Sequence, residues 1–273
     1  MELARQARPA GAVRYREATV SNLPRSGRVS LDERLPPHRV YLVIGGLGAL
    51  LLSILTPPFE VPDEPQHLYR IFQLSELELW GSVRDGTTGT RLPSSLPELV
   101  EHFLGTRANH AARPLRAHPW RDTWAQLTRP LDPERREFVP FVGSITYPPF
   151  AYAPQVLAVA LMRTLGAPPL LLLYAARLAN ALVAVALLAW ALRAMPVGRE
   201  AALVVALFPM SQFLVASASQ DAITLASALV LTAIGLSLHR RSWWSGGDLI
   251  AATVAGTALC AAKPFYLPLL LVG

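Results

Sequence analysis

The sequence predicts an all-α, polytopic transmembrane protein, and three observations support this fold class. Of the 273 residues, 52% are hydrophobic and only 16% are charged. Several nearly uncharged runs approach the ~20 residues that an α-helix needs to cross a ~30 Å hydrocarbon core. Residues 1–39 contain eight Arg and four acids, whereas residues 58–147 contain ten Arg and twelve acids. This asymmetry is typical of a membrane protein's orientation signal, so the net charge of +6 does not indicate nucleic-acid binding.

The chain divides into four regions. Residues 1–39 are rich in Arg, Pro and Ser and predict a disordered, basic cytoplasmic tail. Residues 40–57 predict a first transmembrane helix, which no small-x-small cleavage pattern follows, so we expect an uncleaved anchor. Residues 58–168 predict an extracytoplasmic loop with juxtamembrane helices. Residues 169–273 predict a transmembrane helical bundle that ends within a further hydrophobic run, which indicates an incomplete C-terminus.

The topology depends on one ambiguous segment, Pro149–Leu165. If it lies along the membrane interface, the basic loop 193–199 and His239-Arg240-Arg241 both fall on the cytoplasmic side, as the positive-inside rule requires. If it crosses, both fall outside. We therefore favour the interfacial arrangement, with the N-terminus cytoplasmic and the protein in the cell inner (plasma) membrane. The other segments with the composition of spans are Pro169–Leu192, Ala201–Ala218, Ala222–Leu238 and Leu249–Ala262.

Within the long loop, the pattern from Pro65 to Leu79 predicts an amphipathic helix that rests on the membrane, with Leu68, Ile71 and Phe72 on one face. Residues 81–140 predict short helices and irregular loop. The single cysteine, Cys260, excludes an intramolecular disulfide. The spacing of His102, His110 and His118 matches no standard zinc site.

Two adjacent carboxylates, Asp63 and Glu64, follow the Pro-rich exit of the first hydrophobic segment. One interpretation is structural: Asp63 as a helix N-cap and Gln66 three residues later resemble a capping box. The other is chemical, because a carboxylate fixed at a membrane surface can act as a general base or as a ligand to a divalent cation such as Mg or Mn. His67, one helical turn after Asp63, could orient it or bind phosphate.

Asp221 lies between two hydrophobic segments and, in the favoured topology, on the same outer face as Asp63. It is either a helix N-cap or a second carboxylate of a catalytic or metal site. Arg177 lies within an apolar segment, where an unpaired cation costs several kcal/mol. We therefore expect Arg177 to pair with Asp63, Glu64 or Asp221, or to contact a substrate phosphate.

Tyr147-Pro148-Pro149-Phe150-Ala151-Tyr152 begins the ambiguous segment. Its aromatic residues suit the headgroup belt of a membrane, and the Pro pair suits a helix start. The alternative is that Tyr147 or Tyr152 stacks on a sugar. Phosphate-binding Gly-rich motifs and nucleophile elbows do not occur in the sequence.

The order of these features resembles that of a known bacterial membrane-protein family, domain of unknown function 2142. The matching elements are Pro-Asp-Glu-Pro-Gln-His, Tyr-Pro-Pro-Phe-Ala-Tyr, Leu-Leu-Tyr-Ala-Ala-Arg-Leu-Ala-Asn and Ala-Ser-Ala-Ser-Gln-Asp-Ala. That family in turn resembles the GT-C glycosyltransferases, which include protein mannosyltransferases, the aminoarabinose transferase of lipid A and oligosaccharyltransferases.

The resemblance implies transfer of a sugar from a polyprenyl-phosphate donor, delivered through membrane lipid, to an extracytoplasmic acceptor. It implies that Asp63 is the base or metal ligand, with Glu64 beside it, and that Asp221 is the acid of the second outer loop. One departure is that Ser217 and Ser219 stand where several GT-C enzymes have an Arg, so phosphate stabilisation would fall to Arg177. The alternatives are a non-catalytic component of envelope polysaccharide assembly or transport, and a truncated fragment.

Overall fold

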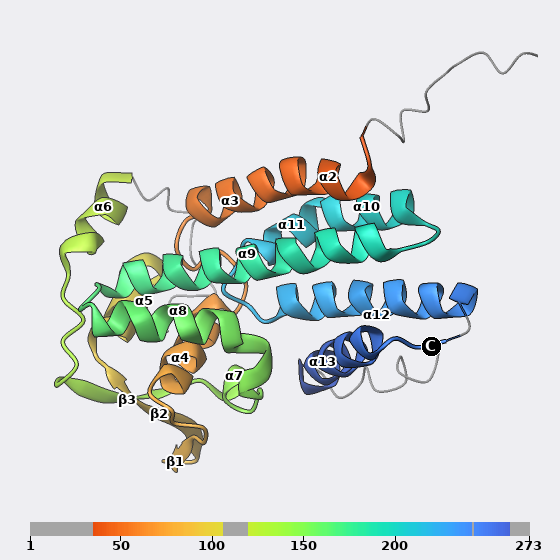
Figure 1. Ribbon diagram of the computed structural model, residues 1–273. Coiled ribbons are helices and arrows are strands. Elements are labelled where there is room, and N and C mark those ends of the chain that lie inside the picture. The colour runs from red at the N-terminus through yellow and green to blue at the C-terminus, as the bar shows by residue number, and fades with distance from the viewer. Residues whose placement is uncertain (1–34, 106–119, 242, 263–273) are drawn as a thin grey trace, which may run out of the picture. The chain divides into compact units, whose positions relative to one another are not determined.

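A computed structural model describes residues 35–105, 120–241 and 243–262, all within one compact unit, Leu35–Gly273. Three of its helices are long and apolar enough to cross a membrane: Pro37–Leu55, Pro169–Ala194 and Asp221–Arg241. The first combines α2 (Pro37–Val40), the π-helical turn η1 (Tyr41–Gly45) and α3 (Gly46–Leu55), and the others are α9 and α12 (Figure 1). The helical membrane fold expected from the sequence is confirmed. Most of the basic tail, His110, His118 and the final hydrophobic run lie outside the described residues.

One end of these helices is basic. Basic side chains from α2, from the end of α9 and from the first residue of the next helix interact electrostatically there: His38, Arg39, Arg193 and Arg199. A hydrogen bond from Ser237 Oγ to the carbonyl oxygen of Ala194 (3.1 Å) brings the last turns of α12 to the same place. We call this the basic end, and we call the opposite end, where α3 stops and α9 and α12 begin, the acidic end.

The segment Ala201–Ala218, expected as one span, forms two helices, α10 (Arg199–Leu207) and α11 (Pro209–Val215). Pro209 has no N–H to donate and excludes the α conformation from the preceding residue, so Phe208 is extended (ψ 138°). Together α10 and α11 return the chain from the basic end to the acidic end. The last described helix is α13 (Gly246–Ala262).

Residues 58–168, which we call the insert, connect α3 to α9. Their helices are α4 (Glu64–Ser75), α5 (Ser95–Leu104), α6 (Trp120–Ala125), η3 (Gln126–Thr128), α7 (Val142–Ile145), η4 (Pro149–Tyr152) and α8 (Ala153–Thr164).

The insert also contains an antiparallel sheet, in the order β1 (Ser82–Arg84), β2 (Thr87–Pro93), β3 (Arg136–Pro140). The short helices expected over residues 81–140 are present as α5, α6 and η3, but the expectation of irregular loop is wrong where the strands form. Gly89 pairs with Pro140, and a Cβ at Gly89 would lie 2.2 Å from the carbonyl oxygen of Val139, so the close approach of β2 and β3 requires glycine there.

The hydrophobic face of α4 packs inside the protein. Leu68, Ile71 and Phe72 are at most 1% exposed and belong to a core shared with α5, α8 and the start of α9. The amphipathic helix was expected, but the prediction that this face rests on the membrane is wrong. The periodicity shows only that one face is buried, and here the neighbouring helices bury it.

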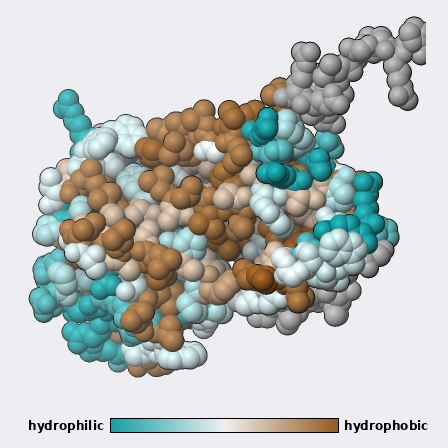
Figure 2. Space-filling model, viewed as in Figure 1, coloured by the Kyte–Doolittle hydropathy of each residue, from teal (hydrophilic) through white to brown (hydrophobic). Residues whose placement is uncertain are grey.

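Helix α8 forms a hairpin with α9. Gln155 near the start of α8 donates to Asn180 of α9, and the turn between the helices is only four residues long, 165–168. This hairpin keeps the chain at the acidic end between α4 and α9. The non-crossing topology stays a prediction. Helix α8 is not one of the three candidate spans. Figure 2 shows hydrophobic side chains over the face that carries α3, α9 and α8.

Candidate functional site

A fully buried ion pair joins the insert to the long helices. Arg177 of α9 and Glu64 of α4 are both 0% exposed and form two parallel hydrogen bonds, Nε to Oε1 at 2.8 Å and Nη2 to Oε2 at 2.6 Å. The other guanidinium N–H groups donate to carbonyl oxygens at the exit of α3, those of Ser53, Thr56 and Pro57. The pair therefore fixes the start of α4 to the end of α3 and to α9.

This ion pair has no hydrogen-bonding capacity left. All five N–H groups of Arg177 are used, and the Glu64 carboxylate also accepts from the N–H groups of Phe59 (3.1 Å) and Ala218 (3.3 Å). The prediction that Arg177 pairs with a nearby acid is confirmed. Contact of Arg177 with a substrate phosphate, or catalysis by Glu64, would require the pair to break.

Asn180, one helical turn after Arg177, holds the loop that precedes α12. Its Nδ2 donates to the carbonyl oxygens of Ser217 (2.7 Å) and Ser219 (2.9 Å), and its Oδ1 accepts from Gln155 Nε2 (2.9 Å). All of these groups are buried. Helices α8 and α9 and the start of α12 are thus held together by amide hydrogen bonds.

Asp63 directly precedes the buried pair but is exposed. Its backbone is left-handed (φ 59°, ψ 5°), and it occupies the N-cap position of α4 without a side-chain capping bond. A capping side chain reaches the N–H groups of the first turn from an extended backbone, which this conformation prevents. Gln66, the expected partner in a capping box, instead accepts from the N–H of Gly143 at 3.0 Å. The capping interpretation is therefore wrong.

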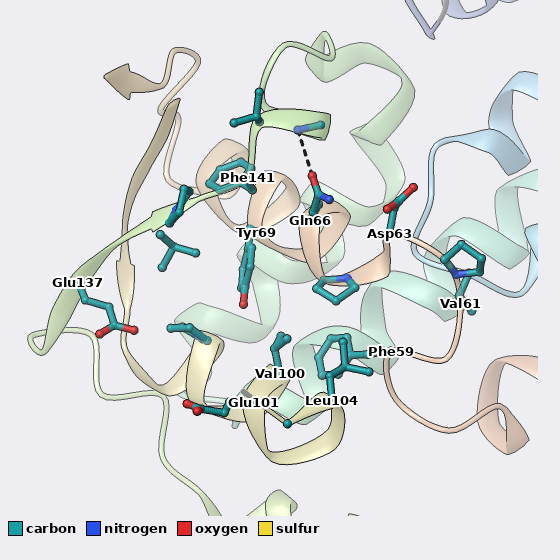
Figure 3. A pocket seen from close by; sticks show the side chains of 18 of the residues that line it. Phe59, Val61, Asp63, Gln66, Tyr69, Val100, Glu101, Leu104, Glu137 and Phe141 are labelled. Carbon is teal, nitrogen blue, oxygen red and sulfur yellow. Dashed lines mark hydrogen bonds between the residues drawn. The ribbon is translucent and has the colours of Figure 1, made fainter. Parts of the chain in front are cut away.

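Asp63 lines a cavity of about 860 Å³ between the start of α4, α5 and β3 (Figure 3). Among the described residues, the Asp63 carboxylate has neither a hydrogen bond nor an ion pair. The described lining combines four carboxylates, those of Glu60, Asp63, Glu101 and Glu137, with the aromatic rings of Phe59, Tyr69, Phe138 and Phe141, and it includes no Arg or Lys. Such a lining suits a polar, uncharged or cationic ligand and repels an anion.

His67, Tyr147 and Tyr152, all expected in the site, meet on the other side of α4. His67 Nδ1 and the Tyr152 hydroxyl share a hydrogen bond of 2.6 Å, and the Tyr147 ring stacks on the imidazole with ring centroids 6.4 Å apart. Burial raises the pKa of Tyr152 well above its ordinary value, so its hydroxyl stays neutral at physiological pH. Because Tyr152 is fully buried, its ring could stack on a sugar only after a rearrangement of the surrounding side chains.

Asp221 begins α12 at the acidic end, and its backbone N–H donates to Ser219 Oγ at 3.1 Å. Its charge helps to raise the pKa of Tyr152, so Asp221 lies within electrostatic reach of the aromatic cluster, whereas Asp63 lies at the cavity. No hydrogen bond joins the two carboxylates in the described part of the chain. In residues 35–105, 120–241 and 243–262, no group of three His, Cys, Asp or Glu side chains could hold a metal ion. The Mg or Mn site expected at Asp63 and Asp221 stays a prediction.

Two further polar residues that the sequence did not single out position the site. Arg70 is 3% exposed and donates to the Tyr147 carbonyl oxygen through Nε (3.1 Å) and Nη2 (2.8 Å), which fixes the Tyr-Pro-Pro turn. Gln155 links α8 to Asn180, as described above. Gln155 could have been found from the sequence, because it is a lone amide in an apolar segment. Arg70 lies in an amphipathic helix, where an arginine is ordinary, so its sequence context does not indicate a buried role.

The three apolar helices and the polar network at their acidic end define a polytopic helical membrane protein. The chain belongs to the family described as Predicted membrane protein (DUF2142), whose model matches residues 46–273. This confirms the family that the motif order indicates. Comparisons with curated proteins and with solved structures gave no match.

Proposed function

We propose that this protein is a GT-C-like glycosyltransferase of the inner membrane that moves a sugar from a polyprenyl-phosphate donor to an extracytoplasmic acceptor. The observation that carries the proposal is Asp63: a carboxylate with no partner among the described residues, at an 860 Å³ cavity, next to an ion pair that fixes its position relative to the candidate spans. A carboxylate in this setting can accept a proton in the transition state.

The cavity favours the acceptor as its occupant. Phosphate would meet four carboxylates and, in the described lining, no cation, whereas a hydroxylated acceptor can hydrogen-bond to the carboxylates and stack on the aromatic rings. In the proposed step, Asp63 takes the proton of an acceptor hydroxyl, whose oxygen forms the new bond to the sugar's anomeric carbon. The bond from that carbon to the donor phosphate breaks, and the phosphate leaves on its lipid.

The test compares Asp63→Asn with Glu134→Gln, which neutralises an exposed carboxylate of the insert that does not line the cavity. Cells that lack the protein would be supplied with each variant, and their envelope glycans and lipids compared by mass spectrometry. We expect the wild type and Glu134→Gln to restore a sugar-containing species, and Asp63→Asn to restore none at equal membrane abundance. Restoration by Asp63→Asn would rule out the proposed base.

A second candidate is a non-catalytic component of envelope polysaccharide assembly or transport. The observation in its favour is that Glu64 and Arg177, two of the residues expected in the site, are saturated by structural bonds. An assembly role predicts that Asp63→Asn behaves as wild type, whereas loss of the whole protein still changes the envelope.

A further inference from the structure

Four large hydrophobic side chains are exposed directly after α4. Leu77, Leu79, Trp80 and Val83 are 86%, 49%, 82% and 73% exposed, and we call them the 77–83 patch. A single exposed hydrophobic residue needs no explanation, but four within seven residues form a group that calls for a partner.

The backbone under the patch is fixed, so the exposure is built into the fold. The carbonyl oxygen of Leu79 accepts from Arg70 (3.1 Å), and that of Trp80 accepts from Gln73 (3.0 Å). Both donors are buried. The side chains of Leu79 and Trp80 are therefore held outward by bonds that the interior makes to their own main chain.

Leu77 adds a second observation. The N–H of Leu77 donates to the Leu74 carbonyl oxygen (3.0 Å) and the N–H of Glu78 to that of Gln73 (3.2 Å), which is the Schellman ending of an α-helix. Its left-handed position, here at φ 62°, is usually glycine, because a side chain is strained there. The chain instead has a leucine whose side chain gains almost no burial in the protein.

The acids of this segment face inward. Glu76 binds Arg136 and Arg163, and Glu78 accepts from the Thr90 hydroxyl. The outward surface of residues 76–84 is thus largely hydrophobic. At its edge the exposed side chain of Arg84 forms an ion pair with Asp85 (3.9 Å). Hydrophobic and aromatic side chains beside a cation suit the headgroup region of a bilayer.

The location of the patch also fits a membrane. The Glu64–Arg177 pair ties the start of α4 to the exit of the first candidate span, and α4 then crosses the direction of α9 instead of continuing it (Figure 1). Helix α4 has 12 residues, so the patch lies about 18 Å along the axis of α4 from the start of that helix. Figure 2 shows hydrophobic surface that continues from the long helices over α8 toward the part of the insert that carries β1.

We propose that the 77–83 patch inserts into the headgroup region of the membrane leaflet at the acidic end, so that the insert contacts lipid there. The occupant is the lipid surface. A second copy of the chain, added at the exposed edge strand β1, is the competing occupant that the experiment must separate.

The experiment uses the full chain with Cys260→Ser, reconstituted in liposomes, with an environment-sensitive fluorophore on a single cysteine. Leu77→Cys and Trp80→Cys test the patch. Leu182→Cys, 73% exposed on α9, is the lipid-facing control, and Glu134→Cys, exposed in the insert, is the water-facing control. Lipid-attached quenchers placed near the headgroups or deep in the acyl chains report depth, and aqueous iodide reports exposure to water.

We expect both patch probes to be quenched more by the headgroup-level lipid than by the deep one and to be protected from iodide when compared with Glu134→Cys. Quenching by iodide as strong as at Glu134→Cys, with none by either lipid, would overturn the proposal. Protection from iodide without lipid quenching would also overturn it, in favour of contact with a second copy. Only variants that elute like the parent from a sizing column are compared, and Val83→Cys replaces either probe that does not.

Discussion

At the scale of single residues, Asp63 and Glu64 are adjacent in the chain but have opposite environments. The left-handed backbone of Asp63 leaves its carboxylate at the cavity, while Glu64, the first residue of α4, is fully buried against Arg177. A buried charge is tolerated when paired and fully hydrogen-bonded, and both conditions hold here. The pair also satisfies five backbone groups, so its loss would leave these without a hydrogen-bond partner in addition to the two charges. The five groups belong to Ser53, Thr56, Pro57, Phe59 and Ala218.

We predict that Arg177→Met destabilises the protein strongly, because it leaves the Glu64 carboxylate buried without its cation. Breaking a buried pair costs about 3–5 kcal/mol, which corresponds to a fall of roughly 10 °C in the unfolding midpoint for a chain of this size. The measurement is the midpoint of thermal unfolding in detergent, monitored as the fraction of protein that stays monodisperse after heating. Arg193→Met, an exposed arginine at the other end of α9, is the matched control and should change the midpoint little.

The same measurement tests coupling. Adding Glu64→Gln to Arg177→Met should cost far less than Glu64→Gln costs alone, because the neutral amide no longer faces a buried cation. Equal shifts for Arg177→Met and Arg193→Met would contradict the structural role of the pair.

At the scale of elements, the sequence predicted helices better than it predicted their surroundings. A 3.6-residue period identified α4, yet it did not tell protein from lipid as the cover of Leu68, Ile71 and Phe72. The sheet was missed because β1 is exposed throughout and β2 owes its conformation to pairing with β3, about fifty residues away. No local pattern reports such long-range pairing.

The site was predictable to a similar extent. A cation within an apolar segment must have a partner, so a pair involving Arg177 could be foreseen. The sequence did not show which of the two adjacent acids, Asp63 or Glu64, would be that partner, because the left-handed turn at Asp63 decides it. The turn depends on the whole exit of α3, where Phe59 also has a positive φ of 66°.

For the ending of α4, we predict that Leu77→Gly stabilises the protein by about 1 kcal/mol, because glycine adopts the left-handed conformation without the side-chain clash. The unfolding midpoint in detergent should rise, and the same substitution should weaken the contact of the insert with lipid, read from the probe at Trp80→Cys. Leu79→Gly serves as the control, since Leu79 is not among the positive-φ residues and glycine there brings no such gain.

At the scale of the whole molecule, the charges are sorted along the helices. The basic end gathers His38, Arg39, Arg193 and Arg199, and the acidic end holds the insert, Asp63 and Asp221. The positive-inside rule predicts the orientation in which the basic end is cytoplasmic. The structure adds a reason that the sequence lacked: the turn between α8 and α9 belongs to the same end as the exit of α3, because α8 pairs with the first half of α9.

This arrangement leads to a topology prediction that can be checked with a membrane-impermeant thiol reagent on intact cells, using Cys260→Ser and one new cysteine at a time. Glu60→Cys and Leu165→Cys, both exposed, should be labelled from outside, whereas Gly198→Cys and Arg241→Cys should be labelled only after the membrane is opened. Leu165 is the decisive position because it lies in the turn between α8 and α9. Labelling of Gly198 but not of Leu165 in intact cells would mean that the segment 149–165 crosses. The turn between α8 and α9 would then lie across the membrane from Asp63, which the Glu64–Arg177 pair and the Gln155–Asn180 bond do not allow within one folded molecule.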